Sequence, residues 1–425
     1  MLITGARTVD GFATDFYVRD GVFADPLQAP PNVRRVDAAG LLALPGLVDL
    51  HTHLRQPGRE DAETIATGTL AAARGGFTCV HAMANTTPVT DTAERAEWIR
   101  QTAAAQASCE VAVVGAVTKG LAGEELADLE AMAAGGARVF SDDGRCVADS
   151  LLMRRALEFA AATGAVIAQH SQDPRLAGPT ACCHESHVSR ELGLDGWPAQ
   201  AESAIVARDV QLAELTSGRL HVCHVSTAET VDVLRWAKAR GIPVTAEVTP
   251  HHLLLDTPLL ASGDTTYKVN PPLRTTEHLE AVREALADGT IDAVATDHAP
   301  HAASDKAKPF PEASPGMLGL EQALSVVIDV MVNTGRMDWP TLAERMSYTP
   351  ARIGRVADQG RPLAIGEPAN VVLVDPARRA PVDPQTSASL SRNNPYRGLD
   401  LPDPVVMTVC AGRVAFNRHP GLVPG

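Results

Sequence analysis

The segment Leu47–His53 reads LVDLHTH, an apolar run that ends in two histidines separated by one residue. Side chains on a strand alternate between its two faces, so His51 and His53 are expected to point the same way. Two imidazoles on one face at the end of a buried strand suit a metal ion, although such a pair taken alone is also compatible with a surface or core role. The segment therefore predicts the first strand of the fold and places two candidate ligands at its carboxyl end.

Seven further apolar runs follow through the middle of the chain. The eight runs are Leu47–Leu50, Cys79–Met83, Glu110–Val114, Arg138–Phe140, Val166–Ala168, Leu220–Val222, Val244–Val248 and Ile291–Ala295. Most of them start about 30 residues apart, the length of one strand plus one crossover helix. Between them, stretches such as Glu94–Ala104 and Ala199–Leu215 repeat apolar residues at helical intervals. This pattern predicts an α/β fold, a (β/α)8 TIM barrel, with a doubly wound open sheet as the alternative.

The two ends of the chain show a different pattern, of short β-branched segments separated by turns. Phe16–Val18 near the start and Asn370–Asp375 near the end are examples. Because chain termini often lie close together, these pieces are expected to pair into one small β-sandwich domain. The predicted organisation is a first part of the β domain at residues 1–45, a catalytic barrel at 46–365 and a second part of the β domain at 366–425.

Composition and charge exclude several classes of function. The 425 residues are 45% hydrophobic and 21% charged, which is ordinary for a globular protein. The net charge of −14, with no basic run, argues against a nucleic-acid surface, which needs clustered Lys and Arg. No apolar run reaches the roughly 20 residues that span a bilayer, and residues 1–10 do not resemble a signal peptide. Seven cysteines without a CxxC motif suit reduced thiols, so we expect a soluble cytoplasmic protein without membrane or nucleic-acid partners.

Further candidate metal ligands stand at the ends of four other predicted strands. They are Asp142 and Asp143 after the fourth strand, His170 after the fifth, His224 after the sixth and Asp297 after the eighth. Imidazoles and carboxylates at five separate strand ends are difficult to explain as packing, because the carboxyl end of the strands is where barrel enzymes place their chemistry. Both ligand types suit zinc, and an open coordination position lets the metal activate water. The cluster therefore predicts a site for one or two metal ions.

Longer motifs around these residues resemble the dihydroorotases of the amidohydrolase superfamily, of the bacterial class I type. The matching stretches are His51–Gly58, Phe140–Gly144, His224–Ser226, Lys268–Arg274 and Ala295–His301. They follow in order between Ala43 and Gly366, and the flanking β segments are similar as well. The resemblance implies a zinc-dependent barrel enzyme that interconverts L-dihydroorotate and N-carbamoyl-L-aspartate in pyrimidine (UMP) biosynthesis.

The resemblance also implies a role for each site residue. The implied metal ligands are His51 and His53 on one ion, His170 and His224 on the other, Asp143 bridging both, and Asp297, which would also move the proton. The implied substrate contacts are Arg55, Asn85, Asn270, His301 and the backbone of Pro315 and Gly316. The residue chemistry agrees, because a guanidinium is a planar fork for the substrate carboxylate and a carboxylate beside the metal can act as a base. An ordinary surface ion pair is the alternative for Arg55.

Two departures from the family pattern lie beside predicted site residues. The family commonly has His-Cys-Glu-Asp and Met-Pro-Asn-Thr where this chain has HSQD at residues 170–173 and MANT at 83–86. The ligand His170 and the contact Asn85 are kept, so activity is expected to be kept. Loss of the Cys-Glu pair is expected to alter the support of His170, because outer partners tune a metal ligand.

Two more histidine-containing segments invite a structural interpretation. Cys182–His187 is expected to be an exposed insertion with free thiols rather than a second metal patch. The pair His251-His252 follows the seventh strand and could reach the pocket. Its place before the apolar Leu253–Leu255 favours a role in packing.

Three functions are compatible with these features. The first is dihydroorotase, the second is another cyclic amidohydrolase such as a hydantoinase or allantoinase, and the third is a non-catalytic dihydroorotase-like partner of aspartate transcarbamoylase. Hydantoinases typically bridge their metals with a carboxylated lysine on the fourth strand, where this chain is expected to have Arg138, and the non-catalytic proteins have lost ligands. The expected partners are the small-molecule substrate and, for assembly, a second copy of the chain or aspartate transcarbamoylase.

Overall fold

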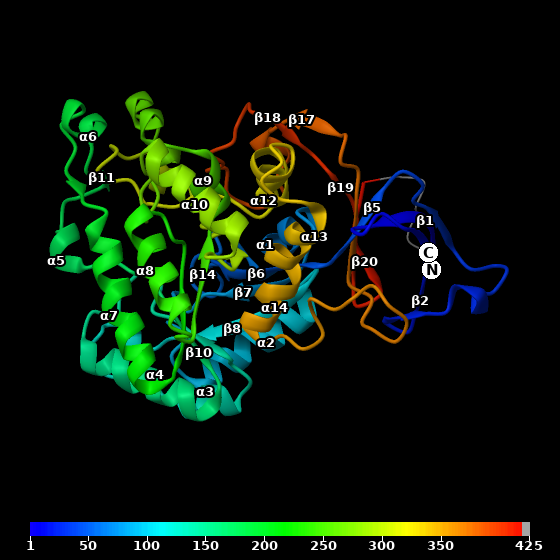
Figure 1. Ribbon diagram of the computed structural model, residues 1–425, viewed down its shortest axis with the longest axis horizontal. Coiled ribbons are helices and arrows are strands. Elements are labelled where there is room, and N and C mark those ends of the chain that lie inside the picture. Colours follow the sequence, from blue (N-terminus) through cyan, green and yellow to red (C-terminus); the bar gives the residue numbers. More distant parts are fainter. Residues whose placement is uncertain (419–425) are drawn as a thin grey trace.

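The computed structural model describes residues 1–418 as a barrel joined to a smaller, strand-rich region (Figure 1). The barrel strands are β6 (Leu47–Thr52), β7 (Phe77–Ala82), β8 (Glu110–Gly115), β9 (Val139–Phe140), β10 (Val166–Gln169), β13 (Arg219–Val222), β14 (Val244–Val248) and β15 (Ala293–Val294). Each pairs with the next barrel strand in parallel, and a bridge between Thr52 and His298 brings the eighth strand beside the first. All eight predicted runs are strands, which confirms the TIM barrel and excludes the open sheet.

Helices surround this sheet (Figure 1). The longer ones are α1 (Ile65–Arg74), α2 (Ala93–Gln106), α3 (Leu129–Ala134), α4 (Ser150–Thr163), α7 (Gln200–Thr216), α8 (Ala228–Ala239) and α10 (Thr276–Asp288). Shorter ones are α5 (Pro174–Ala177), α6 (His187–Glu191), α9 (Pro250–Leu254), α11 (Ala303–Lys306), α12 (Ala323–Val327), α13 (Trp339–Ala343) and α14 (Thr349–Gly354). Side-chain caps fix where several of them begin: Asp149, for example, accepts hydrogen bonds from the backbone of Leu151 and Leu152 at the start of α4. No helix within residues 1–418 is long and apolar enough to cross a membrane.

Strands from both ends of the chain form a second sheet, in which the first and last parts of the sequence lie side by side (Figure 1). Its strands are β1 (Leu2–Thr8), β2 (Ala13–Arg19), β3 (Val22–Ala24), β4 (Arg35–Asp37), β5 (Leu42–Pro45), β16 (Val371–Val374), β19 (Val405–Cys410) and β20 (Arg413–Asn417). The two ends meet where β5 pairs antiparallel with β16, with Ala43 opposite Leu373. The eight strands are hydrogen-bonded into one continuous sheet.

Where β5 pairs with β16, alternate side chains of each strand contribute to two different hydrophobic cores. Ala43 and Leu373 belong to the core of the chain-end sheet, whereas their neighbours Leu44 and Val372 belong to the core of the barrel. Both faces of β5 and β16 are therefore buried. The seam fixes the chain-end sheet against the amino end of the barrel, because β5 ends at Pro45 and β6 begins at Leu47.

The segment between β10 and α7 is less exposed than the sequence predicts. Cys182, Cys183 and His184 are buried at 5%, 1% and 6% exposure, so the prediction of an exposed insertion is wrong. Here β11 (Cys183–His184) pairs with β12 (Gly196–Trp197), and the two cysteines pack against Leu260 and Phe310. The expectation of free thiols is met, since all seven cysteines are unpaired in the described structure. Two strands of another short sheet, β17 (Arg379–Pro381) and β18 (Asp400–Pro402), complete the fold.

Candidate metal centre and active site

Asp143 lies among four histidines at the carboxyl end of the barrel. Its Oδ2 is 3.3 Å from Nε2 of His51 and 3.4 Å from Nε2 of His53. Its Oδ1 is 3.2 Å from both Nδ1 of His170 and Nε2 of His224. All five side chains are buried. One carboxylate thus faces two pairs of imidazoles: the first pair stands at the end of β6, and the second follows β10 and β13.

Asp297 completes the group from the end of the eighth strand. Its Oδ1 is 3.0 Å from Nε2 of His53 and 3.6 Å from Nε2 of His51. The backbone of Asp297 is left-handed, with φ of 44°, and so is that of His224, with φ of 35°. Such conformations are costly for residues with a side chain and concentrate at functional sites. The two ligands are therefore aimed by local backbone geometry as well as by the strands that precede them.

The centre holds its carboxylates in the ionised form. Burial alone would raise the pKa of Asp143, but the surrounding histidines, His51 first, bring this pKa well below its ordinary value. The same balance lowers the pKa of Asp297, through His51 and His53. Two buried carboxylates are costly unless positive charge or hydrogen-bond donors compensate them. The adjacent histidine rings supply N–H donors and, where protonated, positive charge.

The donor set fits metal ions. Two groups of three potential ligands, His51 with His53 and Asp143, and Asp143 with His170 and His224, each have their ligand atoms within 4.8 Å of one another. Nε2 of His51 is buried and has no hydrogen-bond partner within residues 1–418. Imidazole nitrogen and carboxylate oxygen are the ligands that zinc prefers outside thiolate sites. The two groups share Asp143, so the arrangement has room for two adjacent cations.

A second layer of hydrogen bonds orients the first histidine pair. Nδ1 of His51 lies 2.9 Å from Oε1 of Glu247, whose Oε2 lies 3.0 Å from Nε2 of His221. Nδ1 of His53 lies 2.9 Å from Oδ1 of Asn85. An imidazole that donates from Nδ1 keeps Nε2 free as a ligand, and both Nε2 atoms face Asp143. Sequence reasoning missed Glu247 and His221; a carboxylate inside the apolar run of β14 was the available signal.

Gln172 gives the second pair its support. Its Oε1 lies 2.9 Å from Nε2 of His170 and accepts a hydrogen bond of 2.8 Å from Nδ2 of Asn270. His170 therefore donates from Nε2 and presents Nδ1 to Asp143. At this position the chain has an amide where the family commonly has a carboxylate, and the amide oxygen contacts both His170 and Asn270. The Oγ of the neighbouring Ser171 has no partner among the described residues.

Three predicted substrate contacts meet beside the centre. Nε of Arg55 donates to the carbonyl of Pro300 at 3.0 Å, and its Nη2 lies 3.5 Å from Nε2 of His301. Nε2 of His301 in turn lies 2.8 Å from the carbonyl of Pro315. Burial and the nearby Arg55 lower the pKa of His301 to about 3, so its ring is neutral and its Nε2 carries the hydrogen that this carbonyl accepts. No carboxylate within residues 1–418 forms an ion pair with Arg55, unlike an ordinary surface arginine.

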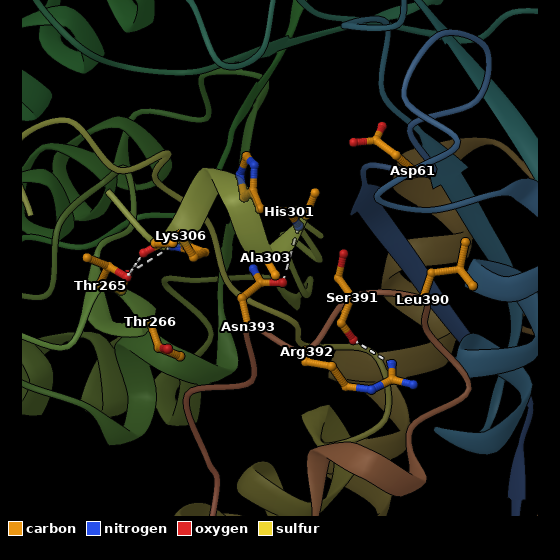
Figure 2. A pocket seen from close by; sticks show the side chains of 12 residues that line it. Asp61, Thr265, Thr266, His301, Ala303, Lys306, Leu390, Ser391, Arg392 and Asn393 are labelled. Atoms are coloured by element: carbon orange, nitrogen blue, oxygen red, sulfur yellow. Dashed lines mark hydrogen bonds between the residues drawn. The ribbon is translucent and has the colours of Figure 1, made fainter. Parts of the chain in front are cut away.

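A cavity of about 420 Å³ opens beside His301. Figure 2 shows His301 and Asn393 at its centre, with Lys306 and Thr265 on one side and Ser391 on the other. The backbone N–H of His301 donates to Oδ1 of Asn393 at 3.2 Å. Among the predicted site residues, His301 lines this cavity, whereas the proposed metal ligands do not.

Other residues singled out in the sequence lie elsewhere. Arg138 is exposed at the start of β9 and donates to the carbonyls of Ala133 and Ala137, so assigning it to the place of a bridging lysine is wrong. His252 has the expected packing role, with Nδ1 2.8 Å from Oγ1 of Thr249. His251 is fully buried, and neither of its ring nitrogens has a hydrogen-bond partner in residues 1–418.

Comparisons of sequence and of structure match this chain to differently named proteins. A family model described as "Dihydro-orotase-like" matches residues 40–230. The dihydroorotase of Streptomyces coelicolor is 54% identical over 420 residues, covering 98% of both chains, and that of Mycobacterium tuberculosis is 51% identical over 420 residues, covering 97% of both. Among solved structures, the L-hydantoinase (dihydropyrimidinase) from Arthrobacter aurescens superposes with a TM-score of 0.87 at 25% identity, covering 98% of this chain and 96% of its own. A D-hydantoinase from Thermus sp., at 24% identity and a TM-score of 0.85, shares the fold.

Proposed function

This chain belongs to the dihydroorotase family of cyclic amidohydrolases, and we propose that its cluster of histidines and aspartates holds one or two zinc ions. On this proposal it catalyses the reversible hydrolysis of L-dihydroorotate to N-carbamoyl-L-aspartate in pyrimidine biosynthesis. The observation that carries the proposal is Asp143, which stands between two pairs of buried histidines at the carboxyl end of the barrel.

The proposed ligands divide into two sets around one shared carboxylate. His51 and His53 would hold the first zinc ion, His170 and His224 the second, and Asp143 both. When bound, the zinc ions polarise the amide carbonyl and lower the pKa of water at the site towards neutrality. Glu247 and Gln172 contact the other ring nitrogen of His51 and of His170, and so orient the two rings with a ligating nitrogen towards Asp143.

Asp297 is the proposed base. Its carboxylate, ionised and buried beside His53, would accept a proton from the attacking water and pass it to the amide nitrogen that leaves when the ring opens. Ring closure uses the same carboxylate in the reverse direction. The side chain can serve both directions because it is ionised at the start of each and gives up the proton that it takes by the end.

Arg55 and Asn270 are the proposed contacts for the substrate's polar groups. The guanidinium of Arg55 is held through Nε by Pro300, and it offers a charged fork to the substrate carboxylate. Nδ2 of Asn270 is held by Gln172, whereas its Oδ1 is buried without a partner among the described residues and is free to accept a ring N–H. His301 neutralises no charge and instead fixes the carbonyl of Pro315 at the edge of the pocket.

The alternatives lose support at the shared carboxylate. The residue shared by the two ligand groups is Asp143, in contrast to the carboxylated lysine typical of hydantoinases, and the relatives at 51–54% identity are named dihydroorotase. All six expected ligands are present, which argues against a purely scaffolding protein. Association with a second copy or with aspartate transcarbamoylase stays a prediction from the family resemblance.

The test is a parallel assay of the purified protein with dihydroorotate, hydantoin and allantoin. We expect preferential turnover of dihydroorotate, loss of turnover after prolonged chelation, and its return with added zinc. Faster turnover of hydantoin or allantoin would overturn the substrate, and full activity at negligible metal content would overturn the mechanism.

A further inference from the structure

Lys306, the last residue of α11, is half-buried and directs its ammonium at backbone carbonyls. Its Nζ donates to the carbonyl oxygens of Thr265 at 2.9 Å, Ser314 at 2.8 Å and Lys268 at 3.1 Å. An ammonium has three N–H donors and no acceptor, so these carbonyls use its full hydrogen-bonding capacity. The contact with Thr265 is reciprocal, because the hydroxyl of Thr265 donates to the carbonyl of Lys306 at 2.5 Å (Figure 2).

The segments joined by Lys306 carry two of the proposed substrate contacts. Lys268 lies two residues before Asn270, and Ser314 immediately precedes the Pro315-Gly316 backbone. The carbonyl of Lys268 also accepts the backbone N–H of Gly316 at 2.9 Å. One oxygen atom therefore joins Lys306 and Gly316 and fixes the spacing between the two segments.

Regular structure holds the two segments only at their edges, through the 3-10 turn Thr265–Tyr267 before Lys268 and a bridge between Met317 and His298. Asn270 and Gly316 lie in irregular chain, outside the helices and strands of the structure. Buried carbonyls in such chain need donors, since secondary structure does not satisfy them. Lys306 comes from a third segment, seven residues or more from either one in sequence, and supplies three of these bonds from one atom.

We propose that Lys306 is a positioning residue for the substrate side of the active site. Its ammonium fixes the Asn270 segment against the Pro315-Gly316 backbone, so that both present their polar groups to the ring and carboxylate of the substrate. It acts on substrate binding and leaves the metal ligands unaffected, since it contacts none of them. The proposal rests on the proposed function, because it assumes that Asn270 and Gly316 touch the substrate.

The matched control is Lys238 at the opposite end of the barrel. It is also half-buried, and its Nζ donates to the carbonyl of Gly289 at 3.1 Å and to both carboxylate oxygens of Asp292 at 2.7 Å, just before β15. Lys238→Met removes an ammonium that makes three hydrogen bonds, as the ammonium of Lys306 does. Lys238 contacts no proposed substrate residue. This variant therefore measures how much thermal stability is lost when a half-buried, hydrogen-bonded lysine is replaced by methionine.

The kinetic experiment compares wild type, Lys306→Met and Lys238→Met in purified, zinc-loaded form. For Lys306→Met we expect the KM for dihydroorotate to rise about tenfold or more, with kcat within about threefold of wild type and zinc content unchanged. Lys306→Arg, which keeps a charged donor, should recover part of the KM. Lys238→Met should keep the wild-type KM. A KM for Lys306→Met within twofold of wild type, or an equal rise in Lys238→Met, would overturn the proposal.

Hydrogen exchange separates failure of this inference from failure of the proposed function. In Lys306→Met we expect faster amide exchange in peptides spanning residues 265–270 and 314–316, and unchanged exchange in the peptide holding His51 and His53. This readout does not depend on the identity of the substrate. If the variant does not fold, Lys306→Gln, which keeps two N–H donors, takes its place, and unchanged exchange in both segments contradicts the positioning role.

Discussion

The carboxyl end of the barrel and the chain-end sheet are built from similar apolar strands, yet they bury opposite kinds of side chain. At the carboxyl ends of β6 and β15 the barrel buries His51 and His53 beside Asp297, whose Oδ1 is 3.6 Å and 3.0 Å from their Nε2 atoms. The core of the chain-end sheet, around Phe16 and Leu373, is a cluster of apolar side chains. Buried charges are costly unless they are paired, whereas buried apolar area stabilises a fold directly.

This difference indicates that the residues for catalysis and a large apolar core that stabilises the fold lie in separate parts of the molecule. The charged cluster is costly to bury even with its histidine partners, and Nε2 of His51 and Oδ1 of Asn270 have no hydrogen-bond partner among residues 1–418. The apolar sheet clamps the amino end of the barrel through β5 and β16. Substitutions in the two regions should therefore differ in which measurable property they change.

The largest effect is expected from Asp143→Ala. This carboxylate contacts all four histidines, so its removal should release most of the bound metal and abolish turnover. Metal analysis of the purified variant checks the first result and the dihydroorotate assay the second.

Asp142→Ala is the control at the neighbouring position. Asp142 points away from the centre and accepts hydrogen bonds from the backbone N–H groups of Val117 and Thr118 at 2.8 and 2.9 Å. Its loss should lower thermal stability and leave metal content nearly intact. The reverse pattern in the two variants would move the shared ligand to Asp142.

Asp297→Asn comes next. The amide keeps the size of the side chain and an oxygen ligand, but it cannot take up the proton. We expect the variant to bind substrate and at least one metal ion while kcat falls by about 10²–10⁴, in both directions of the reaction. Near-normal turnover with metal in place would mean that another residue moves the proton, with His301 the next to be tested.

Arg55→Met should act on substrate binding. Loss of a charge-assisted contact to the substrate carboxylate is expected to cost roughly 2–4 kcal/mol, seen as a higher KM for dihydroorotate at unchanged metal content. Arg138→Met, which alters an exposed arginine at the other end of β9, should leave KM unchanged. An unaltered KM in the Arg55 variant would remove this residue from the substrate site.

Gln172→Ala should have a smaller effect, on metal affinity. The amide of Gln172 contacts both His170 and Asn270, so its loss should weaken zinc binding by about 10–100-fold, measured by competition with a chelator. Substitution of the adjacent Ser171 by Ala should change this affinity little, since its hydroxyl has no partner within residues 1–418. Equal zinc affinity in wild type and the Gln172 variant would contradict the supporting role.

The sequence predicts the barrel and the ligand positions because both depend on local regularities. Alternation along β6 places His51 and His53 on one face, and each ligand directly follows an apolar run. The contacts of Glu247 with His51 and of Lys306 with Ser314 depend instead on how separate segments meet, and no local pattern records them. Burial of Cys182 has the same cause, since its apolar neighbours come from distant parts of the chain.

Leu373→Ala tests the other side of the comparison and should have the smallest effect on turnover. Leu373 is fully buried in β16, opposite Ala43 and within the apolar core of the chain-end sheet. Truncation of such a side chain leaves a cavity and typically costs about 2–5 kcal/mol of unfolding free energy. Neither the metal ligands nor the substrate contacts touch this core, so kcat, KM and zinc content per folded molecule should equal those of wild type. Denaturant unfolding of the zinc-loaded protein measures the loss of stability, and Leu390→Ala, which truncates a leucine that is 44% exposed, is the control expected to change it little. A change of kcat or KM in the Leu373 variant under conditions where it is fully folded would show that the chain-end sheet shapes the active site through the β5–β16 seam, and the division between the two regions would not hold.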